Sequence, residues 1–118
     1  MEENSKSAVV TGGASGIGFE IAAVLKERGW MVYLLDRNAD ALREACSKLG
    51  LGENHAIACS VTGENEVEAA IARAAADSPL GAVVNSAGIG MDKPAVETSV
   101  EEFRRIIDVN LTGTFVVA

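Results

Sequence analysis

Short apolar runs alternate with segments of helical spacing along this chain, and this alternation is the strongest constraint on its fold. The runs predict four strands, at Ser7–Thr11, Trp30–Leu35, His55–Ser60 and Gly81–Asn85. The first, second and fourth runs are continuously apolar, which is typical of strands buried on both faces. The sequence therefore predicts one α/β domain over residues 1–118, a three-layer parallel sheet with helices on both faces.

Helices are expected between and after these strands. They are predicted over Gly16–Arg28, from an Asn38 cap to about Lys48, over Thr62–Asp77, and from Ser99 through Leu111 to Ala118. Gly29 follows the first helix as a stop signal, and Ser99-Val-Glu-Glu102 has the form of a capping box. The pattern thus indicates strand–helix units rather than hairpins.

Charge and composition exclude several classes of function. The net charge of −7 is opposite to the basic surface that a nucleic acid requires. The chain shows no apolar run of bilayer length and no secretory signal, so we expect a cytoplasmic protein without membrane contact. Cys46 and Cys59 lack metal-ligand spacing, so we expect buried, reduced thiols and no metal site.

The stretch TGGASGIG, residues Thr11 to Gly18, joins the first strand to the first helix. A glycine-rich turn exposes backbone N–H groups, and the helix N-terminus adds donors and partial positive charge, so this loop is suited to a phosphate. A merely structural turn is the alternative. Phe19-Glu20 stands where a P-loop nucleoside triphosphatase has Lys followed by Ser or Thr, which excludes that class.

Asp36 ends the second strand, 18 residues beyond Gly18. A carboxylate at this distance from the loop can bind the adenine-side ribose hydroxyls of a dinucleotide. The alternative is that Asp36 caps the following helix, a role for which Asn38 is already placed.

Three motifs in order resemble those of the short-chain dehydrogenase/reductase family. They are Gly12-xxx-Gly16-x-Gly18 preceded by Thr11, the segment Asn85-Ser86-Ala87-Gly88, and the segment Asp108–Gly113. The resemblance begins at Ser7 and covers the N-terminal half of the family. It implies a Rossmann-like sheet with about four strands in the order 3-2-1-4, incomplete relative to the roughly six strands of a full doubly wound sheet.

The resemblance also implies a cofactor and the residues that bind it. The cofactor would be NAD, with NADP less favoured because the Asp36 carboxylate repels a 2′-phosphate; Arg37 beside it works against this preference. The implied cofactor-binding residues are Gly12, Ser15, Gly16, Ile17, Gly18, Asp36, Arg37, Ser60, Val61, Asn85, Ala87 and Gly88. Ser60-Val61 departs from the Asp-Val typical of the family, so we expect weaker adenine recognition.

The catalytic group of the family is only partly present. Asn110 matches its helix asparagine, which would hold a water in the proton relay. The family's tyrosine general acid/base and the lysine four residues later are not matched, because Tyr33 lies in a predicted strand and Arg37 follows it at that spacing. We therefore expect a truncated half of the fold, ending before that motif, that is inactive alone.

Three hypotheses of function follow. The first is a half-enzyme that binds NAD(H) without turnover, the second an oxidoreductase completed by another chain, and the third a non-catalytic oligomerising module that binds no cofactor. In each case we expect a homo-oligomer rather than a stable monomer. The fourth strand would lie at an open sheet edge, and the last helix is apolar over Phe115–Ala118.

Overall fold

A computed structural model describes residues 6–87, 97 and 99–117 of the chain. Its sheet has the strand order β3-β2-β1-β4, and every pairing is parallel. The strands are β1 (Ser7–Thr11), β2 (Met31–Asp36), β3 (Ala56–Ala58) and β4 (Leu80–Asn85). The predicted α/β class and the predicted order 3-2-1-4 are confirmed.

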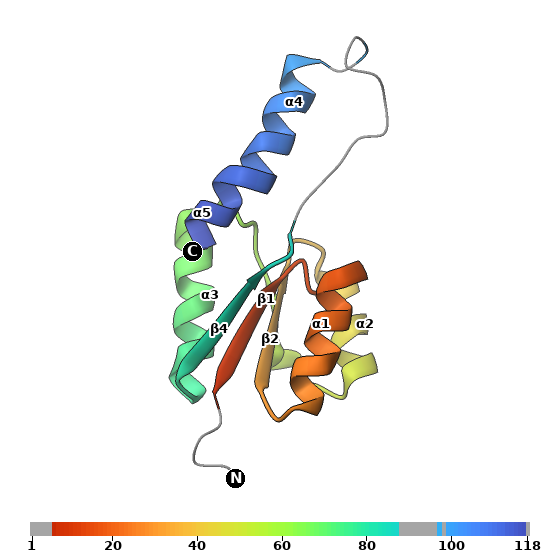
Figure 1. The fold of residues 1–118 in the computed structure, drawn as a ribbon, viewed down its shortest axis with the longest axis vertical. Coiled ribbons are helices and arrows are strands. Elements are labelled where there is room, and N and C mark those ends of the chain that lie inside the picture. The colour runs from red at the N-terminus through yellow and green to blue at the C-terminus, as the bar shows by residue number, and fades with distance from the viewer. Residues whose placement is uncertain (1–5, 88–96, 98, 118) are drawn as a thin grey trace.

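Helices cover both faces of the sheet (Figure 1). The α-helices are α1 (Gly16–Glu27), α2 (Ala39–Leu49), α3 (Glu64–Asp77), α4 (Val100–Ile107) and α5 (Gly113–Val117). Helices α1 and α2 lie on one side of the sheet and α3 on the other, while α4 projects beyond the strands. None of the described helices has the length and apolar character that crossing a bilayer requires.

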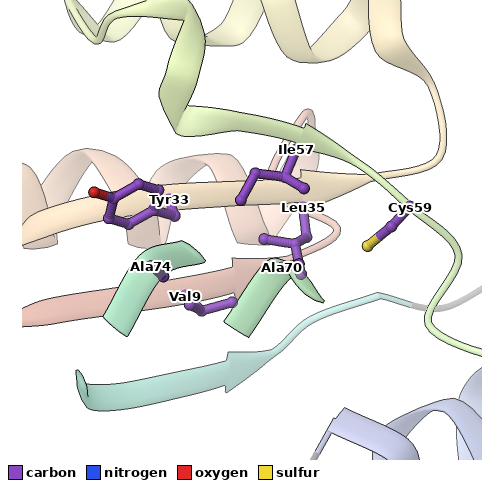
Figure 2. Packing of buried hydrophobic residues seen from close by; sticks show 7 residues of the cluster. All are labelled: Val9, Tyr33, Leu35, Ile57, Cys59, Ala70 and Ala74. Atoms are coloured by element: carbon purple, nitrogen blue, oxygen red, sulfur yellow. The ribbon is translucent and has the colours of Figure 1, made fainter. Parts of the chain in front are cut away.

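Two apolar clusters occupy the two faces of the sheet because successive residues of a strand point to opposite sides. Val10, Val32 and Leu34 pack under α1 and α2. Val9, Tyr33, Leu35, Ile57 and Cys59 pack against Ala70 and Ala74 of α3, as Figure 2 shows. Strands β1 and β2 are thus buried on both faces, as continuous apolar runs predict.

The register brings the carboxyl ends of the strands to one edge of the sheet. Thr11 lies opposite both Leu35 of β2 and Asn85 of β4, and Asp36 lies opposite Ala58 of β3. The segments that follow the four strands therefore converge, and this is the edge at which open α/β sheets bind ligands.

Strand β4 corrects the expectation of burial on both faces. Ala82, Val83 and Val84 are only half-buried, and Leu80 and Asn85 are exposed. The reason is position: among the described strands β4 pairs with β1 alone, so one side of it has no neighbour. The place at the edge of the sheet that was expected for this strand is thus confirmed, while its expected burial on both faces is not.

The region around β3 also differs from the prediction. His55 belongs to a short 3-10 turn, η1 (Glu53–His55), and β3 covers only three residues. Helix α3 begins at Glu64 rather than Thr62. A side-chain bond between Ser60 and Thr62 and a backbone bond from Gly63 to Ser60 form a turn there instead.

Helix boundaries follow the capping signals. The Asn38 side chain accepts a hydrogen bond from the Ala41 N–H at 3.0 Å, and Ser99 with Glu102 forms the predicted capping box. The predicted last helix is helical from Val100 to Val117, but its middle turn, η3 (Asp108–Thr112), is π-helical and lies between α4 and α5. Such turns often lie at functional sites.

Candidate functional site

A cavity of about 410 Å³ lies where the segments after the four strands converge. It brings together many of the residues expected from the sequence: Gly12, Ser15, Ile17, Asp36, Arg37, Ser60, Val61 and Ala87. Its size falls within the range of small-molecule and cofactor sites. The glycine loop, the end of β2 and the turn after β3 therefore form one site rather than three separate features.

Other expected residues do not line this cavity. Gly16 and Gly18 belong to the loop and the first turn of α1, and Asn85 ends β4 with an exposed side chain. Asn110 lies in the π-helical turn η3 and is exposed, with its carbonyl accepting a hydrogen bond from Thr114. Gly88 lies outside the described residues.

Sequence reasoning missed four residues that line the cavity, namely Leu35, Cys59, Ser86 and Val109. Each of them is adjacent in the sequence to an expected residue, so extending every motif by one residue would have found them. Leu35 directly precedes Asp36 at the end of β2, and Cys59 directly precedes Ser60 in the turn after β3. Motif positions thus mark each segment correctly but omit neighbouring residues that line the cavity, most of them apolar.

The glycine loop packs closely against the segment after β4. A Cβ atom at Gly12 would lie 2.8 Å from the Ala87 Cα, and a Cβ atom at Gly18 would lie 2.9 Å from the Gly12 carbonyl carbon and overlap its oxygen. Real Cβ atoms do not approach so closely, so both positions require glycine for packing alone. The backbone of the loop consequently forms one wall of the cavity.

Thr11 joins the first and fourth strands at this wall. Its buried Oγ1 accepts hydrogen bonds from the N–H groups of Ser86 and Ala87, both at 3.1 Å. The same hydroxyl donates to the Val84 carbonyl at 3.4 Å. One side chain therefore holds the segment after β4 in place, a role that its motif position did not reveal.

Asp36 connects the end of β2 with the glycine loop. Its Oδ2 accepts a hydrogen bond from the Ala14 N–H at 3.4 Å, and its Oδ1 accepts one from the Asn38 N–H at 3.2 Å. Asn38, not Asp36, caps α2, as the sequence indicated. The carboxylate is fixed by backbone donors on two sides, and it borders the cavity.

The turn after β3 borders the same cavity through Ser60 and Val61. Ser60 Oγ lies 2.7 Å from Thr62 Oγ1 and accepts a hydrogen bond from the Thr62 N–H at 3.3 Å. The Ser60 N–H donates to the Glu66 carboxylate at 3.3 Å. Val61 packs so closely on Gly113 that a Cβ atom there would lie 3.1 Å from the Val61 Cβ.

Both cysteines are buried free thiols, as expected. Burial first, and then the negative charges of Glu66 and Asp36, raise the pKa of Cys59 to about 11. Burial also raises the pKa of Cys46. Because the thiolate is the reactive form, Cys59 contributes an inert wall to the cavity rather than a nucleophile.

Tyr33 lies in the core and not at the cavity. Its hydroxyl donates a hydrogen bond to the Asp77 carboxylate, and its ring stacks on that of His55 with centroids 4.5 Å apart. Burial, followed by the hydrogen bond and the charge of Asp77, raises the pKa of Tyr33 to about 12. The structural role expected for this residue is confirmed.

Comparison with known proteins assigns the family. The family model described as short chain dehydrogenase matches residues 6–118. The chain belongs to the short-chain dehydrogenase/reductase family. The order of its motifs and the order of its strands are therefore those of a nicotinamide-dependent oxidoreductase family with a Rossmann fold.

Relatives in this family are similar along nearly all of the chain. The 2-dehydro-3-deoxy-L-rhamnonate dehydrogenase (NAD(+)) of Sphingomonas sp. is 42% identical over 93% of the chain and 44% of the relative. A 3-ketoacyl-(acyl-carrier-protein) reductase from Brucella melitensis complexed with NADH has a TM-score of 0.86 at 31% identity, over 95% of the chain and 46% of that protein.

An actinorhodin polyketide ketoreductase variant with NADPH has a TM-score of 0.88 at 33% identity, over 98% of the chain and 46% of that protein. The chain thus spans less than half the length of these short-chain dehydrogenases. Their cofactors include both NAD and NADP, so family membership alone shows a nicotinamide cofactor and not which one.

Proposed function

We propose that these 118 residues form the NAD(H)-binding part of a short-chain dehydrogenase/reductase. The observation that carries the proposal is that the glycine loop and the Asp36 carboxylate border one cavity at the carboxyl edge of the sheet. A dinucleotide lies across this edge in doubly wound folds. Pyrophosphate would lie at the loop, ribose at Asp36, and the two bases toward the ends of β3 and β4.

The loop is suited to the pyrophosphate. Ser15 is the N-cap residue of α1, yet its side chain makes no capping hydrogen bond, and the first turn contains no acidic residue. The N–H groups and the positive end of this 12-residue helix are therefore not neutralised by its own side chains. An anion beside the loop would supply the missing acceptors.

Asp36 supports NAD over NADP. Ribose hydroxyls can donate to a carboxylate, whereas the 2′-phosphate of NADP would place like charges together. The bonds from Ala14 and Asn38 hold the carboxylate where it is, so it does not swing away from a phosphate without losing both. Arg37 also borders the cavity and is the group that would favour NADP.

The chemistry of the bound group is hydride transfer at the nicotinamide ring. Asn110, on the π-helical turn η3, is the residue of this segment that we assign to the proton relay, where it would hold a water. Tyr33 is the only tyrosine in the sequence, and its hydroxyl is bonded to Asp77 in the core. We therefore propose that these residues alone bind the cofactor and do not catalyse turnover.

Association with another copy or another chain is part of this proposal. Helix α4 and the turn after it expose Val100, Phe103, Ile107 and Leu111, which are 64%, 57%, 39% and 66% exposed. Apolar groups of this size on one helical segment are typical of an interface. Light scattering should show an oligomer that Phe103→Glu dissociates, and a monodisperse monomer would refute the assignment.

Calorimetric titration of the chain with NADH and with NADPH tests the cofactor. We expect one NADH site per chain and weaker binding of NADPH. Asp36→Ala should weaken NADH binding and bring the two affinities together, because it removes both the hydroxyl acceptor and the repelling charge. Arg37→Ala is the matched control, since it changes the adjacent side chain and should weaken NADPH only.

Two results would contradict the proposal. If neither dinucleotide binds at millimolar concentration, the chain is the non-catalytic module that the sequence left open. If NADH binds but the ratio of the two affinities is the same in Asp36→Ala, Asp36 does not contact the ribose. Activity that appears only after mixing with another chain would instead favour an enzyme completed in trans.

A further inference from the structure

The part of the cavity beside β3 offers a nucleobase the Ser60 hydroxyl, which is paired with the Thr62 hydroxyl. Because β3 is the outermost strand on the Asp36 side, the turn after it is where the base of a dinucleotide would lie. Ser60 is the polar residue of this turn that borders the cavity, next to the apolar Val61. The inference below rests on the proposed binding of NAD(H).

The Ser60 hydroxyl can present either a donor or an acceptor to a base. A serine oxygen has one proton and two lone pairs, and one lone pair accepts the Thr62 N–H. In the bond between Ser60 Oγ and Thr62 Oγ1, either atom can be the donor. If Ser60 donates to Thr62, its second lone pair is left for the ligand.

The reverse orientation leaves the proton. If Thr62 donates to Ser60, both lone pairs of Ser60 are used and its O–H is directed to other partners. Rotation of two hydroxyls converts one state into the other without moving the backbone. The Ser60 hydroxyl can thus accept a hydrogen bond from an amino group in one state and donate one to a carbonyl group in the other.

Among the described residues, the charged groups that border the cavity are Asp36 and Arg37, which lie at and just after the end of β2 and not in the turn after β3. Glu66 is the nearby carboxylate, but it accepts the Ser60 N–H and is not among the described residues that border the cavity. Asp36 does border it, yet Asp36 is held at the end of β2 by Ala14 and Asn38. A carboxylate can only accept, so its absence from the turn removes discrimination against a carbonyl group.

We propose that this site does not distinguish adenine from hypoxanthine dinucleotides. Adenine carries an amino group at position 6, a donor, and hypoxanthine carries a carbonyl oxygen there, an acceptor. Ser60, paired with Thr62, satisfies both. Ser60 is then the residue that determines base specificity, and it allows both adenine and hypoxanthine.

The direct test titrates the 118-residue chain with NADH and with its deaminated analogue, reduced nicotinamide hypoxanthine dinucleotide. The expected dissociation constants agree within about threefold. Binding of NADH that is tenfold or more tighter overturns the inference while leaving the proposed NAD(H) site intact. Binding of neither dinucleotide overturns both, so the two failures are distinguishable.

Two variants test whether Ser60 determines the preference between NADH and the hypoxanthine analogue. Ser60→Asp replaces the two-way hydroxyl by a permanent acceptor, and we expect a tenfold or greater preference for NADH over the analogue. Thr62→Val is the matched control: it alters the same turn but leaves the Ser60 hydroxyl free to rotate, so the two affinities should stay within about threefold. An unchanged ratio in Ser60→Asp, with both ligands still bound, would show that Ser60 does not contact the base.

Discussion

Replacing Thr11 by valine tests whether one hydroxyl holds the wall of the site. Valine fills the same volume as threonine, so Thr11→Val creates no cavity. It removes the acceptor of the Ser86 and Ala87 N–H groups, which lie at 3.1 Å. It also removes the donor to the Val84 carbonyl.

The expected loss of stability in Thr11→Val follows from these lost hydrogen-bond partners. An unsatisfied buried polar group costs about 1–3 kcal/mol. Ser86 and Ala87 are half-buried, so water can reach part of this segment and each N–H should contribute near the lower limit. We expect Thr11→Val to lower the free energy of unfolding by about 2–3 kcal/mol, measured by denaturant titration.

The matched variant is Thr11→Ser, which retains the hydroxyl and loses a buried methyl group, at a cost of about 1 kcal/mol. NADH affinity should fall in Thr11→Val and not in Thr11→Ser, because only valine releases the segment that contains Ala87. If serine is as destabilising as valine, burial of the methyl group matters more than the three hydrogen bonds, and the assignment of Thr11 is refuted.

Two further perturbations test the loop and the core. Gly18→Ala should lower the free energy of unfolding by about 2 kcal/mol despite the helix preference of alanine, because its Cβ would overlap the Gly12 carbonyl; an unchanged denaturation midpoint would contradict this. Tyr33, whose pKa is raised from about 10 to about 12, should titrate near pH 12 in tyrosinate absorbance. Since the folded state favours the neutral form, the stability advantage over Tyr33→Phe should be complete below pH 10 and fall as the pH rises toward 12.

Continuous apolar runs made the sheet predictable, because only a strand covered on both faces tolerates them. They located β1 and β2 closely, and the capping residues Asn38 and Ser99 located the starts of α2 and α4. The strand order was implied by the motifs of the family rather than by the runs themselves. Burial of β4 on both faces was wrong, because its residues are half-buried or exposed, whereas its expected place at the edge of the sheet is confirmed by the strand order.

The short β3 has a different cause. His55–Ser60 is apolar enough for a strand, but pairing of β3 with β2 extends only from Ala56 to Ala58. Beyond it, Ser60 bonds to Thr62 and Glu66 instead of to a neighbouring strand. Local side-chain bonds compete with sheet pairing, and sequence spacing alone does not show which will form.

The candidate site, like the fold, was predictable in its positions but not in its hydrogen bonds. Spacing selected Gly12 and Asp36, and the resemblance to the family selected Ser60; the fold brings the three to one cavity from separate segments. The motifs did not show the hydrogen-bond partners of the Thr11 and Ser60 hydroxyls, because those of Thr11 are distant in the chain and those of Ser60 depend on a specific turn. Motifs identify the positions of site residues, whereas their hydrogen-bond partners are seen only in the three-dimensional structure.

The three motif glycines do not carry the same information about a ligand. Gly12 and Gly18 are required by contacts within the protein, so a substitution there disturbs the fold whether or not a phosphate binds. A Cβ atom at Gly16 would meet nothing within 4 Å, and only its backbone φ of +61° disfavours a side chain. Loss of NADH binding in a Gly12 or Gly18 variant therefore says little about the pyrophosphate. Gly16 is the position at which packing and ligand contact separate, because a side chain there extends into open space beside the N-terminus of α1.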